Sequence, residues 1–289
     1  MASTQLIKRR IRSVRSTKQI TKAMEMVAAS KMRRAQEATL KSRAFSTTAR
    51  EILTNVKTLT DVSKHPLYKK RNVKSKLYIL ITSDKGLAGA YNANLLKKFT
   101  HLLNEDKSNE IGQFVIVIGK KGSRFVSKLA GIKNIGIYED FPDVPSIDDI
   151  KPIVMNTIEM FVNKEIDAVD VLYTHFYSSI KQEAIVQRIL PAAFEETELR
   201  KDLGDAIFEP SPQAVLDNVT PRLIEAQLHQ TFLEAGASEH SMRMLAMKNA
   251  TDNASELIDD LTLEFNSARQ AAITQELAEI TGGASAVGA

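Results

Sequence analysis

The sequence predicts an α/β domain combined with a long antiparallel coiled coil formed by the two ends of the chain. Three observations predict this fold. Small and apolar residues alternate at steps of three and four near both termini, short β-branched runs fill the middle, and the two ends carry opposite net charge. Heptad spacing is typical of paired helices, whereas short runs rich in Val and Ile are typical of strands.

The longest periodic pattern lies in the C-terminal part of the chain. Unbroken steps of three and four give a period of 3.5 residues, which holds one helix face against a partner in a left-handed coiled coil. Ala and Thr are frequent on this seam, so we expect close approach of the partner backbone. The predicted seam positions are Leu223, Ala226, Gln230, Leu233, Ala237, His240, Met244, Met247, Thr251, Ala254, Ile258, Leu261, Phe265, Ala268 and Ala272.

The N-terminal part supplies the partner helix, because it has the same period and no Pro or Gly before His65. At 1.5 Å per residue each arm is expected to be roughly 80 to 90 Å long. Ile7, Ile11 and Val14 continue the face upstream, with a slip in spacing expected between Lys18 and Thr21. The predicted seam positions are Thr21, Met24, Ala28, Lys31, Ala35, Ala38, Ser42, Phe45, Ala49, Ile52, Val56 and Leu59.

Charge favours the pairing of the two ends. Residues 1–76 carry 20 Lys and Arg against 4 acidic residues, a net charge of +16, whereas residues 221–289 carry 4 against 10, a net charge of −6. Opposite charges attract the arms to each other, but much of the N-terminal positive charge is left for solvent or an acidic partner.

Short β-branched and aromatic runs of strand length occupy the middle, at Leu77–Thr82, Phe114–Gly119, Asn134–Tyr138 and Ala168–Phe176. Helical patterns separate them, at Asn92–Leu103, Ser123–Ala130 and Ser146–Asn163. This alternation favours a Rossmann-like open sheet, mostly parallel, with flanking helices. The run Ala184–Leu190 is expected to add an edge strand.

Proline-containing segments mark the expected boundaries. His65-Pro66 ends the first helix, and Ser211-Pro212 opens the last one with Ser211 as its N-cap. Pro221 is expected to restart or kink that helix. The predicted division is an N-terminal coiled-coil helix at residues 1–65, a central α/β domain at 66–209 and a C-terminal coiled-coil helix at 210–289.

The sequence indicates no catalytic, cofactor or metal site. Ser83–Asn92 lies between a strand and a helix, as a phosphate loop would, but its Gly-x-x-Gly spacing and the lack of a following Lys-Ser/Thr pair fit no phosphate fingerprint. We interpret it, like Gly119–Phe125, as a structural turn. The five His residues lack metal-ligand spacing, and the absence of Cys excludes thiolate chemistry. No apolar run is long enough for a transmembrane helix.

Three stretches closely resemble the gamma subunits of F-type ATP synthases. They are IKRRIRSVRSTKQITKAMEMVAASKMRRAQ, ITSDKGLAGAYN and SEHSMRMLAMKNATDNASELIDDLTLEFNSARQAAITQELAEITGGA, in the order found in that family. The terminal motifs are long and specific, whereas the central one is weak alone. Ala88 stands where the family commonly has Cys, and the Cys-bearing insertion of the chloroplast form is missing, so thiol control is not expected. Met1 leads almost directly into the first motif, which favours a bacterial protein over a processed organellar one.

The resemblance implies a non-catalytic rotor shaft without cofactor. In that family the paired helices turn inside a hexamer of alpha and beta subunits, and the α/β domain lies at the foot beside epsilon and the membrane c-ring. Proton flow turns the shaft, which drives the catalytic beta subunits through ATP synthesis or, in reverse, hydrolysis. The expected location is peripheral, on the cytoplasmic face of a bacterial plasma (inner) membrane.

The resemblance also implies two groups of beta-subunit contacts, although an ordinary solvated helix surface is the alternative at each position. Those expected to face the acidic lever loops of beta are Lys22, Met24, Lys31, Arg33 and Arg34. Those expected to meet its inner loops are Arg243, Arg269, Gln270 and Thr274.

Two other classes of protein stay open. A nucleic-acid-binding coiled coil would use the basic N-terminal arm to neutralise phosphates. A nucleotide-using enzyme would use the central sheet. Neither class accounts for the matching heptads at both ends of the chain.

Overall fold

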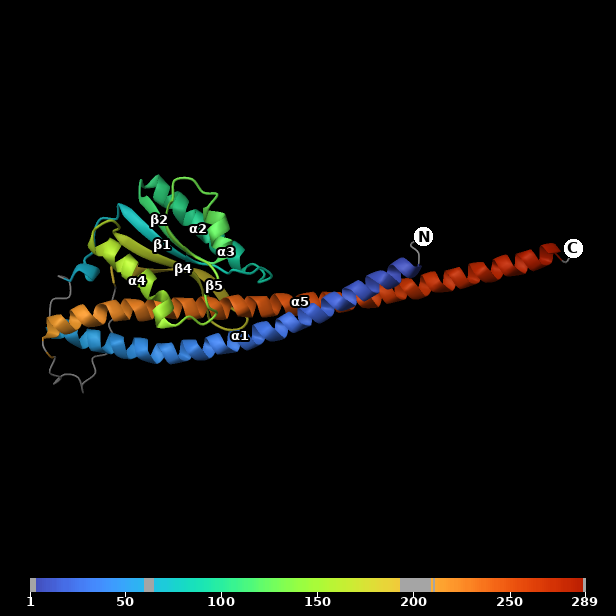
Figure 1. The fold of residues 1–289 in the computed structure, drawn as a ribbon, viewed down its shortest axis with the longest axis horizontal. Helices are drawn as coiled ribbons and strands as arrows, with labels where there is room; N and C mark the ends of the chain where they lie inside the picture. Colours follow the sequence, from blue (N-terminus) through green and yellow to red (C-terminus); the bar gives the residue numbers. More distant parts are fainter. Residues whose placement is uncertain (1–3, 60–64, 193–208, 210, 288–289) are drawn as a thin grey trace. The chain divides into compact units, whose positions relative to one another are not determined.

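The computed structural model describes residues 4–59, 65–192, 209 and 211–287, without the side chains of residues 43–59, 212 and 283–287. Two compact units make up the chain, Met1–Val27 with Met244–Ala289 and Ala28–Arg243. The elements, labelled in Figure 1, are α1 (Thr4–Leu59), η2 (Pro66–Tyr68), β1 (Ser75–Ile81), α2 (Tyr91–Ser108), β2 (Gly112–Ile118), α3 (Lys120–Val126), β3 (Lys133–Tyr138), α4 (Ile147–Val162), β4 (Ala168–Phe176), β5 (Gln182–Leu190) and α5 (Pro212–Val287).

The first unit is a coiled coil. The beginning of α1 and the last part of α5 run in opposite directions within it (Figure 1). The hydroxyl oxygens of Thr21 and Thr251 lie 2.8 Å apart in a buried hydrogen bond between the two helices. Every third or fourth residue faces the partner, as the heptads predicted. The buried seam residues of this unit are Ile7, Thr21, Met247, Thr251, Ala254 and Leu261.

Half-buried Lys18 continues the seam four residues after Val14, and its aliphatic stem can cover the seam while its ammonium group stays in water. The steps from Lys18 to Thr21 and from Thr21 to half-buried Met24 are both three residues, which is the slip in spacing that the sequence predicts. One later detail of the predicted register is wrong. Ala272 is exposed rather than on a seam, as is every side chain from 269 to 282. Within this unit the last part of α5 is longer than the described segment of α1, which begins at Thr4, so no described helix lies against its end.

The second unit contains a five-stranded sheet with the order β3-β2-β1-β4-β5. The first four strands are parallel and β5 is an edge strand, as predicted. The structure adds that β5 runs antiparallel to β4. Helix α3 begins at Lys120 rather than Ser123, because Gly119, with a φ of 92°, turns the chain directly after β2. A side chain there would lie 2.3 Å from the carbonyl oxygen of Thr82, so only glycine fits.

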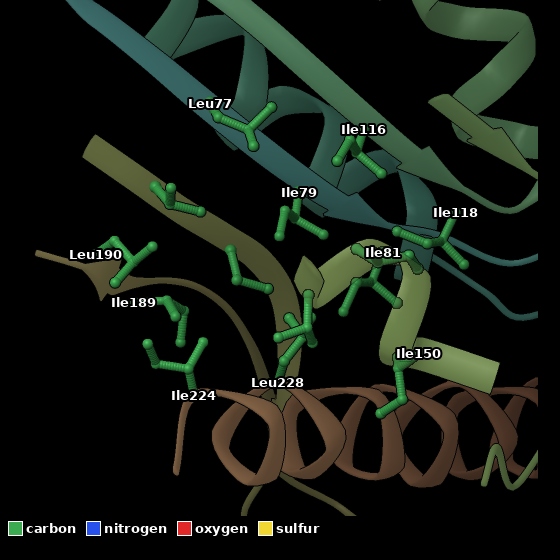
Figure 2. Close-up of a cluster of buried hydrophobic side chains, with 14 of the residues drawn as sticks. Leu77, Ile79, Ile81, Ile116, Ile118, Ile150, Ile189, Leu190, Ile224 and Leu228 are labelled. Carbon is green, nitrogen blue, oxygen red and sulfur yellow. The ribbon is translucent and has the colours of Figure 1, made fainter. Parts of the chain in front are cut away.

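Each face of the sheet has its own apolar core. One core, under α2 and α3, includes Tyr78, Leu95 and Phe99. The other joins the sheet to α4 and α5, and Figure 2 shows Ile224 and Leu228 of α5 facing Ile79 and Ile189 of the sheet. Burial of this apolar surface is the main force that holds α5 on the sheet.

The middle of α5 is buried around most of its circumference. Ile224, Leu228 and Phe232 face the sheet, while the seam positions Leu233 and Ala237 are also buried. In the same unit, Ala28 and Ala35 of the α1 seam are buried. The predicted positions Lys31, Ala38 and Ser42 are half-buried. The predicted α1 positions after them lie outside the described side chains, namely Phe45, Ala49, Ile52, Val56 and Leu59.

The start of α5 follows the sequence pattern, with one difference. Ser211 caps the helix, since its Oγ accepts a hydrogen bond from the backbone N–H of Ala214 at 3.2 Å. Pro221 does not restart the helix, because α5 is continuous from Pro212 to Val287. The hydrophobic contacts of the turns on either side of Pro221, including Leu216 and Leu223, offset its missing N–H.

A buried polar cluster also attaches α5 to the sheet. The carboxylate of Glu234 lies 2.5 Å from Nδ1 of His175 and 3.2 Å from the hydroxyl of Tyr173, both on β4. Burial raises the pKa of the Tyr173 hydroxyl, and the charge of Glu234 raises it further. These directional contacts fix the rotation of α5 about its own axis more closely than apolar packing alone can.

The seam assignment predicts unequal effects of one charge at two neighbouring leucines. Leu261 is 6% exposed on the seam, whereas Leu263 is 70% exposed on the same turn. Leu261→Asp should destabilise the paired helices by on the order of 2 to 4 kcal/mol because it buries a charge, and Leu263→Asp should change stability by less than about 0.5 kcal/mol. Urea unfolding followed by circular dichroism measures both; equal midpoints would show that the seam is misassigned.

Candidate partner-contact surface

The sheet does not present an open ligand site at its topological switch point. In open α/β sheets a ligand binds beyond the carboxyl ends of the strands where the strand order reverses, here between β1 and β4. Both loops at this edge are bonded to α5. Arg243 donates to the carbonyl oxygens of Lys85 and Gly86, and Ser241 Oγ donates to the carbonyl oxygen of Ser179 at 2.8 Å. Helix α5 therefore covers the usual ligand position.

The Ser83–Asn92 loop is closed by its own side chains. Asn92 accepts from the backbone N–H of Ser83 at 3.1 Å and donates to its Oγ at 2.7 Å. The carboxylate of Asp84 accepts from the backbone N–H groups of Lys120 at 3.0 Å and Asp140 at 3.2 Å. A carboxylate thus occupies the place at the start of α3 that a phosphate would need. This geometry supports the interpretation of the loop as a structural turn.

The described parts of the chain contain neither a metal-ligand cluster nor a helix able to span a membrane. Across residues 4–59, 65–192 and 211–287, no three His, Asp or Glu side chains gather in the manner of a metal site. None of the helices, as far as the structure describes them, is long and apolar enough to cross a membrane.

Of the predicted contact residues, Arg243 makes the most hydrogen bonds and ion pairs within the described chain. It is only 8% exposed. Its Nη2 forms an ion pair with Glu239 at 2.6 Å, and Nη1 lies 3.2 Å from Nδ1 of His240. With its bonds to the carbonyl oxygens of Lys85 and Gly86, the guanidinium joins α5 to the loop after β1. Its expected contact with a beta subunit stays a prediction, and that contact would begin from this held position.

Lys31 is also bound within the chain. Its Nζ lies 2.6 Å from the carboxylate of Asp143, in the loop between β3 and α4. The same carboxylate lies 3.0 Å from Nε2 of His240. One loop residue therefore contacts both α1 and α5.

The other N-terminal candidates have ordinary helix-surface environments. Lys22 is exposed and pairs with Glu25 on the next turn at 3.1 Å. Arg33 and Arg34 are exposed, and Met24 is half-buried at the edge of the seam. All four are accessible to some extent, and their contact with beta subunits stays a prediction.

The three remaining candidates lie together near the end of α5. Arg269, Gln270 and Thr274 are all exposed, in the part of the helix where every side chain from 269 to 282 is exposed. This surface also includes Ile273, 45% exposed, and Leu277, 57% exposed. A mixed polar and apolar surface of this kind suits a surrounding partner, and the contact of these three residues with beta subunits stays a prediction.

Sequence reasoning missed the residues that hold the candidates in place. Asp143 carried no signal of its own, since a lone acidic residue in a loop is ordinary. His240 was predicted only as a seam residue. Glu239 alone could have been found, because it precedes Arg243 by four residues and this spacing favours an ion pair on a helix.

The role of Asp84 as a structural anion can be tested directly. Asp84→Ala should destabilise the central unit by about 1 to 3 kcal/mol, because two backbone N–H groups lose their acceptor. Asp84→Asn keeps an acceptor oxygen and should lose less. Urea unfolding compares the variants, and thermal shifts with MgATP test binding; nucleotide binding by either variant or by the unchanged chain would contradict the structural assignment.

Comparisons with known proteins agree with this picture. The family profile described as ATP synthase matches residues 3–287. The ATP synthase gamma chain of Moorella thermoacetica is 42% identical over 289 residues, covering 99% of this chain and 100% of its own length. That of Staphylococcus epidermidis is 40% identical over 288 residues, with the same coverage.

Solved structures show the same fold. A chain in the cryo-EM structure of the Tetrahymena thermophila mitochondrial ATP synthase, central stalk and c-ring, is 27% identical with a TM-score of 0.59, covering 80% of this chain and 99% of that one. A chain of the Euglena gracilis mitochondrial enzyme is 17% identical with a TM-score of 0.67, covering 98% and 94%. The full-length match to the family and the high identity to its curated members lead to one conclusion: the chain belongs to the ATP synthase gamma chain family.

Proposed function

We propose that the chain is the central rotor shaft of an F-type ATP synthase. It couples proton-driven rotation of the membrane c-ring to the conformational cycle of the catalytic beta subunits in ATP synthesis and, in reverse, in hydrolysis. The observation that carries this proposal is the pair of terminal helices, whose narrow seam of small residues leaves most of the charged surface facing outward. As a gamma chain it is a non-catalytic subunit of the complex.

The helices meet the physical needs of a shaft. Helix α1 is unbroken from Thr4 to Leu59 and α5 from Pro212 to Val287, so no loop interrupts either helix. The small seam residues Ala254 and Thr251 allow close backbone approach. A shaft acts by making different contacts with different states of its partners, and therefore needs an uneven surface rather than reactive groups.

The partners in this proposal are the alpha and beta hexamer, epsilon and the c-ring. A chain of the Tetrahymena structure named for its central stalk and c-ring supports the assembly. The net charge of +16 on residues 1–76 suits acidic partner loops. The corresponding location is peripheral, on the cytoplasmic face of a bacterial inner membrane.

The same proposal assigns a separate role to each part of the chain. Residues 1–65 and 210–289 would form the shaft and carry the beta contacts, at Lys22, Met24, Lys31, Arg33, Arg34, Arg243, Arg269, Gln270 and Thr274. Residues 66–209 would form the foot beside epsilon and the c-ring. Helix α5 takes part in both, because its middle packs on the sheet.

The two other classes of function are not supported. Family membership over the full length explains the basic N-terminal helix without nucleic acid. The nucleotide-enzyme hypothesis conflicts with the closed loop at Ser83–Asn92 and with α5 over the switch point.

The proposal predicts that the purified chain alone has no ATPase activity. Activity should appear only when alpha and beta subunits are added, and proton-driven synthesis only with the membrane sector present. A coupled-enzyme assay on the chain, on alpha with beta, and on the three together checks this. Steady turnover by the chain alone that Lys85→Ala or Lys120→Ala abolishes would contradict it.

A second prediction concerns contacts that form only at some rotor angles. Arg243→Gln and Gln270→Leu should each slow hydrolysis and synthesis about ten- to a hundredfold if a charge-assisted or amide hydrogen bond is made in the rate-limiting state. Asn266→Leu, exposed on the same helix, is the matched control and should stay near the wild-type rate.

Assembly must be measured beside these rates, because Arg243 also holds α5 to the loop after β1. Gel filtration of the reconstituted complex separates the two effects. Wild-type rates for both Arg243→Gln and Gln270→Leu in assembled complexes would leave these positions as plain shaft surface.

A further inference from the structure

A chain of three side chains leads from a surface loop to Arg243. Asp143, in the loop between β3 and α4, lies 3.0 Å from Nε2 of His240. Nδ1 of the same imidazole ring lies 3.2 Å from Nη1 of Arg243. All three residues belong to the second compact unit, and His240 is only 3% exposed. The buried imidazole therefore connects the loop to the guanidinium.

The partners of His240 determine its tautomer. An arginine guanidinium can only donate hydrogen bonds, so Nδ1 must be the acceptor, without a proton. An ionised carboxylate can only accept, so Nε2 carries the proton and donates it to Asp143. The ring is thus neutral. The other neutral tautomer would place an N–H donor against Arg243 and leave Asp143 without a hydrogen-bond donor.

Asp143 is itself fixed in place from two sides. Lys31 of α1 lies 2.6 Å from Oδ2, while His240 uses Oδ1. The hydrogen bond from His240, together with that from Lys31, holds the pKa of Asp143 well below its usual range. The loop also lies close to α5 at Gly236, where a side chain would come within 3.0 Å of the carbonyl oxygen of Asp143. The carboxylate is therefore a rigid, charged end to the chain of hydrogen bonds.

We propose that His240 and Asp143 are positioning residues for Arg243. They hold its guanidinium in one orientation while Glu239 neutralises its charge from the other side, so that a partner group meets an arginine already ordered. A free arginine side chain samples many rotamers, and ordering it on contact weakens that contact. This inference rests on the proposed function, because it assigns Arg243 a partner contact.

The structure supplies a matched control on the same helix and the same loop. His229, about three turns before His240 on α5, lies with Nε2 2.8 Å from the carbonyl oxygen of Pro145. It therefore holds the β3–α4 loop to α5 as His240 does, but none of its described hydrogen bonds reaches Arg243. Replacing His229 tests loosening of the loop without loss of the link to the guanidinium.

The experiment measures ATP hydrolysis by complexes reconstituted with alpha and beta, after assembly is verified by gel filtration. His240→Leu should slow hydrolysis about five- to tenfold, the effect of losing one hydrogen bond that orients the guanidinium. His240→Gln should restore a rate within about twofold of wild type, since the amide can donate to Asp143 and accept from Arg243. His229→Leu should likewise stay within about twofold of wild type.

A double substitution distinguishes positioning from a general structural role. If His240 acts through Arg243, then His240→Leu should add no further loss in an Arg243→Gln chain. Independent, multiplying losses would overturn the proposal, as would a wild-type rate for His240→Leu or equal losses for the Leu and Gln variants. A slow Arg243→Gln complex with unaffected His240 variants would reject only this inference. A wild-type Arg243→Gln rate would reject the Arg243 contact itself, and the positioning role with it.

A spectroscopic readout applies even if His240→Leu fails to assemble. In the full-length chain labelled with nitrogen-15 histidine, His240 should show a neutral ring protonated at Nε2 and not at Nδ1. Asp143→Ala should remove this preference, whereas Asp143→Asn keeps an acceptor oxygen and should preserve it. A ring protonated at Nδ1 in the unchanged chain, or one that ignores Asp143→Ala, would contradict the proposed geometry.

Discussion

Close packing along the seam of the terminal helices is the constraint on which the rest of the structure depends. Side chains as small as Ala28, Ala35 and Ala254 fill the buried positions, together with the hydrogen-bonded pair Thr21 and Thr251. Such a seam buries little apolar area per turn, so the paired helices gain stability from length and from continuity of the heptads. The exposed surface is left free to carry charge.

The middle of α5 contributes residues both to this seam and to the apolar core of the sheet. Ile224, Leu228 and Phe232 fill one apolar core, and Glu234 bonds to the β4 residues Tyr173 and His175. The same helix then covers the switch point, where other open α/β sheets bind ligands. The sheet therefore serves as a base to which a shaft helix is fixed, which accords with a gamma chain that has no chemistry of its own.

Polar groups near the seam fix the orientation of α5 on the sheet. Apolar packing tolerates small rotations, whereas buried hydrogen bonds with charged partners hold one geometry. The carboxylate of Asp143 binds Lys31 and His240. Arg243 forms an ion pair with Glu239 and donates to a carbonyl oxygen of the loop after β1. If torque passes from the α/β domain to the helices, this is a set of contacts that resists rotation of α5 against its base.

The sequence by itself determined the features that depend on local periodicity. The seam positions from Thr21 to Ala35 and from Leu223 to Leu261, the four parallel strands and the Ser211 cap could be predicted because hydrophobic period and capping act over a few residues. Only the tertiary structure decided which residues of distant segments meet. Asp143 reaches Lys31 and His240, and Arg243 folds onto Lys85 and Gly86, because the sheet places these loops beside α5. The exposure of α5 from 269 to 282 likewise depends on the extent of the described part of α1, which the heptad pattern of α5 alone does not predict.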